Sequence, residues 1–478
     1  MWFCSNFNAF ETISVSLNNH LIYFAIVNQY INPRMKKHSV LAWSMVVALG
    51  GFLFGFDTAV ISGAEKSIQQ FWHLSVFEHG LTISIALIGT VIGSLVGSRP
   101  SDYFGRKNTL YFVAIAYLLS SLGTALADNW YVFLTFRFLG GLGVGISSVT
   151  APIYISEVSP ADRRGRLVGL FQFNVVLGIL ISYLSNYLIS QGGETSWRWM
   201  LGVQAFPSFL FLVLIKFIPE SPRWLILKKG ATDKALEILR IINPLNCEQE
   251  LKAIQNSGTA LSGSSGQKEK LFSAQYKRPV LLAMLFAFFN QVSGINAIIY
   301  YAPRIFEMAG LGAHSSLLST VGIGLINFIF TLIAINFIDR VGRKVLMLIG
   351  SVGLIVSLFL VGYTFYSGNM SGFAIPAYMM LFIAFFAFSQ GAVIWVFISE
   401  IFPNQVRAKG QTLGSSTHWV MAAIIAFCFP YLAETFGGAT TFFFFSSMMV
   451  LQLIFVWRLM PETKGRSLEQ IETTLVMH

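Results

Sequence analysis

The sequence predicts an all-α membrane protein with twelve transmembrane helices, arranged as two six-helix bundles related by pseudo-two-fold symmetry. Three observations predict this class. Of the 478 residues, 55% are hydrophobic and only 11% are charged, whereas a soluble domain carries about 25% charged residues. Apolar stretches of about 20 residues, the length that crosses a bilayer as a helix, recur along the chain. The charged motifs between these stretches also occur twice, in the same order.

The duplicated motifs divide the chain into two homologous halves. The segment Asp-Tyr-Phe-Gly-Arg-Lys at 102–107 returns as Asp-Arg-Val-Gly-Arg-Lys at 339–344. Two further motifs return at nearly the same offset, which lies between 237 and 243 residues. They are EVSP at 157–160 with EIFP at 400–403, and PESPR at 219–223 with PETKGR at 461–466. Three ordered motifs at one offset indicate an internal duplication, and duplicated membrane halves are typical of secondary transporters.

Twelve apolar stretches are long enough to cross a bilayer. They cover about residues 40–63, 80–99, 108–127, 130–153, 167–190, 199–218, 279–302, 314–338, 345–367, 374–399, 410–433 and 438–459. The loops after the second, fourth, eighth and tenth stretches hold clusters of Arg and Lys, whereas the opposite loops hold only Lys66, Arg198 and Arg304. Because basic residues favour the cytoplasmic side, this bias places both termini in the cytoplasm.

Changes in composition divide the chain into segments. We expect an N-terminal extension at 1–34, an N-terminal six-helix bundle at 35–218, a cytoplasmic linker with short helices at 219–278, a C-terminal bundle at 279–460 and a cytoplasmic tail at 461–478. The extension has an apolar run, Leu21 to Ile31, that is too short for a span and lacks the basic start and cleavage site of a signal peptide. Met1 and Met35 are both candidate starts, because the transporter pattern begins at Met35.

Other function classes find no support in the residues. The net charge of +10 falls in alternate loops, as membrane topology requires, and so does not indicate a nucleic-acid partner. Cys4, Cys247 and Cys428 form neither a metal-ligand spacing nor a disulfide pattern. The glycine-rich run 140–145 lies in an apolar helix, where small residues serve packing, and does not follow a strand as a phosphate loop does. We therefore expect neither an enzyme nor a metal site.

Further motifs are spread over both halves. They are GFDTAVISG at 55–63, RFLGGLGVG at 137–145, PIYISE at 152–157, PESPR at 219–223, QVSGIN at 291–296, YYAP at 300–303, WVFISEIFP at 395–403 and PETKG at 461–465. Together they resemble the sugar porter family of the major facilitator superfamily, from about residue 40 to 470. Within that family the pattern is similar to the bacterial xylose–proton symporters and more distantly similar to facilitative glucose transporters.

The resemblance implies symport of a monosaccharide, a hexose or a pentose, with a proton, by alternating access of the two halves. It implies the sugar, the proton and the lipid bilayer as partners, and no cofactor besides the transported proton. Short external loops favour a bacterial inner membrane, and we expect the protein to act as a monomer. Two alternatives are open, a proton-independent sugar uniporter and a sugar sensor with a transporter fold.

Asp57 and Arg137 are the candidate proton-coupling residues. They lie within the first and fourth apolar stretches. An ionised carboxylate in a bilayer costs about 2.5–3.5 kcal/mol on insertion scales, so acids there usually carry function. A carboxylate–arginine pair whose separation changes between two states would bind and release a proton, whereas a permanent structural ion pair would not. The resemblance favours the first role, because the matching acid is linked to proton coupling in xylose–proton symporters and is Asn in glucose facilitators.

A sugar site needs amides, which donate and accept hydrogen bonds, and aromatic rings for the apolar sugar faces. Asn290, Gln291 and Asn296 crowd one apolar stretch beside Gly294, where the helix can break. A single membrane amide is more often glue between helices, but three close together favour ligand binding. The resemblance implies that sugar contacts come from Gln172, Asn290, Gln291, Asn296, Trp395 and His418, with a lining of Phe54, Tyr300, Phe386, Gly391 and Trp419 and a nearby amide, Asn327.

Three residues depart from the family pattern and leave the sugar open. His418 stands where the family usually has an amide, so it can form a hydrogen bond to a hydroxyl or relay a proton. Asn290 replaces a common Gln, and Ile179 replaces a Gln of the xylose symporters but matches the glucose facilitators. Because one missing polar contact alters sugar preference, glucose, galactose, xylose and arabinose are all candidates, and inositol is a weaker one.

Two duplicated charge sets lie at the ends of the helices. The N-terminal set is Arg106, Glu157 and Arg164, and the C-terminal set is Arg343, Glu400 and Arg407. We expect them to form a gating network that closes the inner face in the outward-facing state and breaks when that face opens. The alternative is ordinary solvated charge, worth about 0–1 kcal/mol for each pair.

Overall fold

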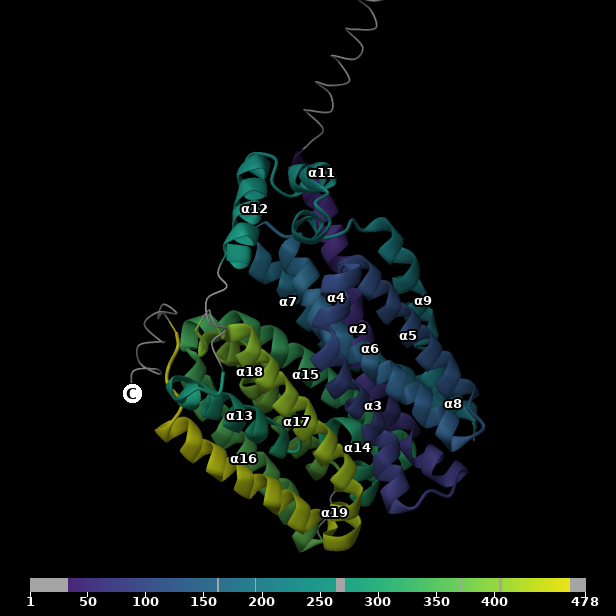
Figure 1. Cartoon of the computed structure of the whole chain (residues 1–478). Coiled ribbons are helices and arrows are strands. Elements are labelled where there is room, and N and C mark those ends of the chain that lie inside the picture. The colour runs from purple at the N-terminus through teal and green to yellow at the C-terminus, as the bar shows by residue number, and fades with distance from the viewer. Residues whose placement is uncertain are drawn as a thin grey trace, which may run out of the picture.

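The computed structural model describes residues 33–160, 163–193, 195–263, 271–368, 372–403 and 406–464. All regular elements in these ranges are helical, which confirms the predicted fold class. Figure 1 shows the first part of the chain as one helix bundle and the last part as a second bundle beside it. The candidate start Met1 and the tail from residue 465 onward lie outside the described ranges.

The described residues of the N-terminal half form six helical segments that are long and apolar enough to cross a membrane. Its helices are α2 (Pro33–Phe71), α3 (Val76–Val96), α4 (Ser98–Phe104), α5 (Arg106–Leu126), α6 (Trp130–Glu157), α7 (Arg164–Ile189), α8 (Ser196–Gly202) and α9 (Ala205–Leu214). Together α8 and α9 make one crossing. The start of α3 is fixed by a capping box, because the Ser75 hydroxyl accepts from the Glu78 backbone N–H while the Glu78 carboxylate accepts from that of Ser75.

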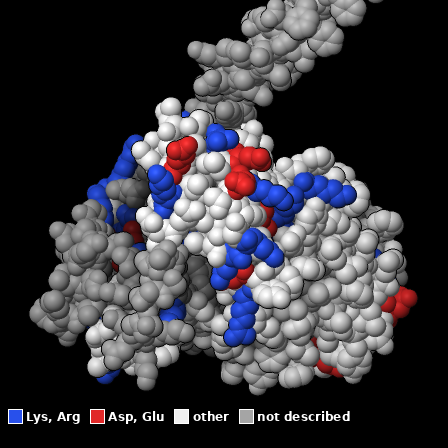
Figure 2. Space-filling model, turned by 45° about the horizontal axis from the view of Figure 1, so that its top comes forward, with Lys and Arg blue, Asp and Glu red and all other residues white. Residues whose placement is uncertain are grey.

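The linker between the halves is mostly helical. It contains α10 (Pro222–Trp224), α11 (Thr232–Ile242) and α12 (Cys247–Gly263). Ala235, Leu239 and Ile242 give α11 one buried face, at the spacing of an amphipathic helix. Figure 1 shows α11 and α12 at one end of the molecule, which we call the linker end; the opposite end is the far end. Figure 2 shows Lys and Arg gathered over the linker end.

The C-terminal half contains α13 (Lys277–Val292), α14 (Ile295–Met308), α15 (Ala313–Val341), α16 (Arg343–Ser367), α17 (Ala374–Phe388), α18 (Gln390–Glu400) and α19 (Arg407–Arg458). The apolar part of α19 has 50 residues. Such a helix would be about 75 Å long, more than twice the ~30 Å hydrocarbon core. Gly437, at φ 75° and ψ 167°, interrupts it between the two last predicted stretches. The 11 apolar helices found in the described residues therefore provide the twelve expected crossings.

Small residues bring the helices of the N-terminal half into close contact. A Cβ atom on Gly141 of α6 would lie 1.9 Å from the backbone carbonyl oxygen of Ala86 on α3. A Cβ atom on Gly145 would lie 2.3 Å from the backbone carbonyl oxygen of Thr90. The glycine-rich run 140–145 thus serves helix packing, as predicted. This contact matters for function because α6 also carries Arg137.

Candidate functional site

A buried ion pair lies in the core of the N-terminal half. Nη1 of Arg137 on α6 donates a hydrogen bond of 3.0 Å to Oδ1 of Asp57 on α2. Only 3% of Asp57 and 2% of Arg137 is exposed. Removing either partner would leave an uncompensated buried charge. The structure therefore brings the two predicted proton-coupling residues into direct contact.

Gln204 is a third polar residue at this pair, which the sequence analysis missed. It lies at the junction of α8 and α9, is 2% exposed, and its Nε2 donates to the Leu53 carbonyl over 3.5 Å, with the side chain close to the Asp57 carboxylate. Among the described residues, Nε and Nη2 of Arg137 have no hydrogen-bond partner. These two nitrogens can therefore donate to another acceptor if the Asp57–Arg137 pair separates. An amide inside the apolar stretch 199–218 was the available sequence signal for Gln204.

The predicted amides of the C-terminal half form a connected cluster. Nε2 of Gln291 donates to Oδ1 of Asn290 over 2.8 Å, and Oε1 of Gln291 accepts from Nδ2 of Asn296 over 2.6 Å. Gly294 separates α13 from α14 in the left-handed conformation, at φ 84°, so the predicted helix break is confirmed. The three amides are buried and alternate donors with acceptors, which is the pattern that a sugar hydroxyl requires.

Aromatic rings lie against this amide cluster. Nδ1 of His418 is 3.1 Å from Nε2 of Gln291, so the imidazole joins the hydrogen-bonded group. The rings of Trp395 and Trp419 lie 4.9 and 4.8 Å from the His418 ring, and Phe54 of the other half lies 5.6 Å from Trp419. Trp395 is 37% exposed, which leaves part of its ring open to a ligand. Residues of both halves therefore meet beside the amides.

Tyr300 connects the amide side of the site to the ion pair. It lies on α14, is 2% exposed, and is close to the hydroxyl of Thr58, the residue after Asp57. Thr58 in turn donates to the Phe54 carbonyl over 2.9 Å. A side chain of the C-terminal half thus reaches the helix turn that carries the candidate proton acceptor.

The remaining predicted lining residues lie around the cluster. A Cβ atom on Gly391 of α18 would lie 3.4 Å from the ring of Phe386 on α17, so these two residues touch across the break at Ser389. Gln172 and Asn327 are half-buried on α7 and α15, and within the described residues neither hydrogen-bonds to the amide cluster. Their neighbours Phe173 and Phe328 pack together with ring centroids 5.4 Å apart. The two amides therefore lie on helices that pack together, but they are not part of the hydrogen-bonded amide cluster.

Each gating set forms bonds within its own half. Arg106 donates to both carboxylate oxygens of Glu157, over 3.0 and 3.2 Å, and Nη2 of Arg343 donates to Glu400 over 2.8 Å. Nε of Arg164 donates to the Ser156 carbonyl, and Nε of Arg407 to the Phe402 carbonyl. The duplicated motifs thus build the same arrangement twice.

Two duplicated glutamates, Glu220 and Glu462, complete these networks. Glu220 accepts from the backbone N–H groups at the start of α5, and Glu462 accepts from those at the start of α16. Burial raises the pKa of Glu220 above its ordinary value. Burial acts in the same direction on Glu462, but four backbone N–H donors outweigh it and lower the pKa of that carboxyl. A carboxylate at a helix start is stabilised by the helix dipole. Each glutamate therefore ties the chain after the last helix of its own half to an earlier helix of that same half, at the linker end.

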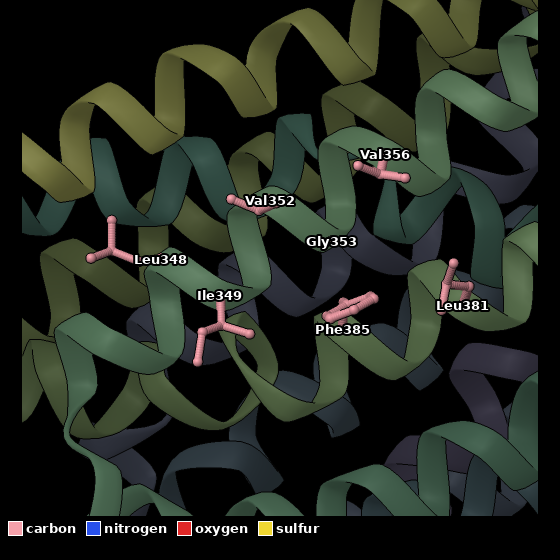
Figure 3. A pocket seen from close by; sticks show the side chains of 7 residues that line it. All are labelled: Leu348, Ile349, Val352, Gly353, Val356, Leu381 and Phe385. Atoms are coloured by element: carbon pink, nitrogen blue, oxygen red, sulfur yellow. The ribbon is translucent and has the colours of Figure 1, made fainter.

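A groove of about 720 Å³ lies away from the polar site, between α16 and α17 (Figure 3). Its lining consists of Leu348, Ile349, Val352, Gly353, Val356, Leu381 and Phe385. Ile349 and Val352 are about half exposed on the outside of the bundle. This apolar surface offers a sugar no hydrogen-bond partner from a side chain, so we do not assign it to the candidate site.

The protein matches known transporters along nearly its whole length. The family model described as "Sugar (and other) transporter" matches residues 43–475. The arabinose–proton symporter of Bacillus subtilis is 38% identical over 92% of this chain and 96% of that protein. The D-xylose–proton symporter of Escherichia coli is 33% identical over 92% of this chain and 97% of that protein.

The fold agrees with these matches. The structure of the Escherichia coli xylose transporter in an inward-open conformation aligns with a TM-score of 0.81 and 32% identity, covering 91% of this chain and 100% of that one. The resemblance that the motifs suggested is therefore confirmed at the level of sequence and of structure. The chain belongs to the family of sugar transporters.

Proposed function

We propose that this protein is a proton-coupled symporter of a monosaccharide, a hexose or a pentose, which works by alternating access. One observation carries the proposal: the buried Asp57–Arg137 pair lies close to Tyr300 of α14, the helix that also carries Asn296 of the amide cluster. A proton acceptor beside a helix that also carries a ligand contact is what coupling needs. Relatives named as arabinose–proton and xylose–proton symporters support it.

The proton step follows from the ion pair. When Asp57 takes a proton it loses its charge, and its attraction to Arg137 falls from that of an ion pair to that of a hydrogen bond from the charged guanidinium to a neutral carboxyl group. Arg137 then turns to other acceptors, for which Nε and Nη2 are unused in the described residues. Gln204, whose side chain lies close to Asp57, limits the movement of the carboxyl group in both states. The separation of the pair thus depends on the proton.

The sugar step uses the amide cluster and its rings. Asn290, Gln291, Asn296 and His418 exchange their mutual hydrogen bonds for bonds to sugar hydroxyls, and Trp395 packs on a sugar face. Gln172 and Asn327 join when the halves close around the sugar. Tyr300 transmits the movement of α14 to Thr58 and so to Asp57.

The proposal includes an orientation in the membrane. The basic residues gathered at the linker end favour the cytoplasmic side, so both termini and the gating sets would lie in the cytoplasm and the far end outside. We further propose a bacterial inner membrane and a monomeric unit, since each half builds its own charge network and the site lies between the halves of one chain.

The test is sugar uptake into proteoliposomes under an imposed pH gradient. A panel of labelled glucose, galactose, xylose and arabinose would be offered with and without a protonophore. We expect one of these sugars to accumulate above equilibrium and the protonophore to abolish that accumulation. Saturable uptake that only equilibrates, whatever the gradient, would instead establish a uniporter and reduce the Asp57–Arg137 pair to a structural role.

A further inference from the structure

A cluster of polar side chains joins the two halves at the far end, and the proposed function does not use it. The N-terminal half contributes Glu65, Lys66 and Gln69 of α2 and His79 of α3; the C-terminal half contributes Arg304 and Glu307 of α14 and Glu434 of α19. We call these residues the far-end cluster. They come from α2 and α3 of one half and from α14 and α19 of the other, so no local motif indicated the cluster.

Arg304 is the centre of the far-end cluster. Its Nη1 lies 3.2 Å from Oε1 of Gln69 and 3.4 Å from Oε2 of Glu65, both in the other half. Its Nη2 donates to Glu434 of its own half over 2.9 Å. A second ion pair, Lys66 with Glu307, crosses between the halves beside it. In this structure the cluster therefore holds the two halves together at the far end.

Glu65 is shared between a partner in its own half and one in the other half. Nε2 of His79 lies 2.8 Å from Oε2 of Glu65 and 3.2 Å from Nη1 of Arg304. The side chains of His79 and Glu65 are 0% and 2% exposed. One nitrogen cannot both donate to the carboxylate and accept from the guanidinium. A hydrogen on Nε2 therefore commits His79 to Glu65 and leaves Arg304 facing the imidazole without an acceptor there.

Besides α2, the helices that supply groups around His79 are α6, α14 and α19. The Tyr301 ring of α14 lies 6.0 Å from the imidazole, Phe427 of α19 is against Gly80, and Trp130 of α6 donates to Thr82. Among the described residues, Nδ1 of His79 has no hydrogen-bond partner. Arg304 is thus the cation that directly opposes a proton on His79, while the carboxylate of Glu65 attracts it.

We propose that His79 and Glu65 form a proton-binding site whose occupancy favours separation of the halves at the far end. Separation removes Arg304, together with Glu434, from the imidazole, but Glu65 stays on the same half as His79. The site therefore binds a proton more tightly when the halves are apart, and by linkage the proton favours that state. Protonated His79 also replaces Arg304 as the counter-ion of the buried Glu65 carboxylate. The inference rests on the alternating access proposed above.

The test measures the opening of the far end against pH without measuring transport. Spin labels are attached to cysteines at Tyr131 and Phe373, exposed residues near the far-end starts of α6 and α17, after the native cysteines are replaced by Ser. Asp57→Asn is included so that the other proton site does not titrate. Distances are measured by pulsed electron resonance between pH 5.5 and 8.

We expect the ratio of long to short distances to rise about tenfold on acidification and to lose this dependence in His79→Gln. Glu65→Gln should also abolish it, which provides a second variant if the first folds poorly. His73→Asn, at an exposed histidine of the same end with φ 51°, is the control and should keep the dependence. An unchanged pH response in both His79→Gln and Glu65→Gln would overturn the proposal, even if proton-driven uptake were demonstrated separately.

Discussion

Gln291 and Asn296 are hydrogen-bonded across the break in the seventh crossing, with 2.6 Å between Oε1 of Gln291 and Nδ2 of Asn296. Gly294 lies between them at φ 84°, and a Cβ atom there would be 2.7 Å from the Phe445 ring. The amide pair therefore ties the end of α13 to the start of α14. Because a sugar would compete for the same amides, we infer that binding and rearrangement of the break are linked.

Asn296→Ala should weaken sugar binding. The variant removes one polar contact to the sugar, which costs about 1–3 kcal/mol and lowers affinity roughly 10- to 100-fold. Equilibrium binding of the transported sugar to purified protein measures this. Gln452→Ala is the matched control, since Gln452 is a buried amide that bonds to Gln390 and Ser351 outside the site. An equal loss of affinity in both variants would argue against a sugar contact at Asn296.

Asp57→Asn should abolish uphill uptake but retain counterflow exchange. The amide has nearly the same shape as the carboxyl group but cannot take up a proton, so alternating access continues without coupling. Proteoliposomes with a pH gradient, and separately with sugar on both sides, measure the two activities. Loss of both activities would contradict a coupling role and point to a structural ion pair, whose disruption is strongly destabilising.

Tyr300→Phe should loosen coupling while sugar affinity stays within a few-fold of the wild type. Only the hydroxyl that lies close to Thr58 and to the Asp57–Arg137 pair is lost, so the ratio of accumulated to external sugar should fall. Tyr301→Phe is a close control, because the Tyr301 hydroxyl donates to the Ala426 carbonyl and makes no bond to α2. The idea fails if the two variants accumulate sugar equally well.

Glu400→Gln should bias the protein towards the state that is open at the linker end. Glu400 accepts from Nη2 of Arg343 and from the Thr463 hydroxyl, and an uncharged amide would weaken the bond to the arginine. Labelling of a cysteine placed at the linker end reports the bias. The equivalent change in the other half, Glu157→Gln, should act in the same direction. Unchanged transport and unchanged labelling would show that these charges do not gate.

The sequence predicted the crossings well because hydropathy and repeats are local signals. Gly437 breaks α19 between the stretches 410–433 and 438–459, as the apolar pattern indicated. The contact of Asp57 with Arg137 was also predictable, since each is a lone charge in an apolar stretch. The roles of the gating sets and of the sugar contacts stay predictions until they are tested.

The far-end cluster could not be predicted, for a physical reason. Glu65, His79 and Arg304 lie near the ends of crossings, where single charges are common and usually solvated. Only the packing of α14 against α2 brings Arg304 to Glu65. Gln204 was missed for a similar reason, because a lone amide in a membrane helix ordinarily serves only to hydrogen-bond to a neighbouring helix.

The capping of α5 by Glu220 has a consequence for biosynthesis. Glu220 follows the sixth crossing, so the last member of the N-terminal charge network is translated only after all of that half's helices. The first bundle can then complete its charge network, made by Arg106, Glu157 and Glu220, before any helix of the second bundle leaves the ribosome. Since chains generally fold from the N-terminus during synthesis, the first bundle could be inserted and completed alone and serve as the platform on which the second assembles.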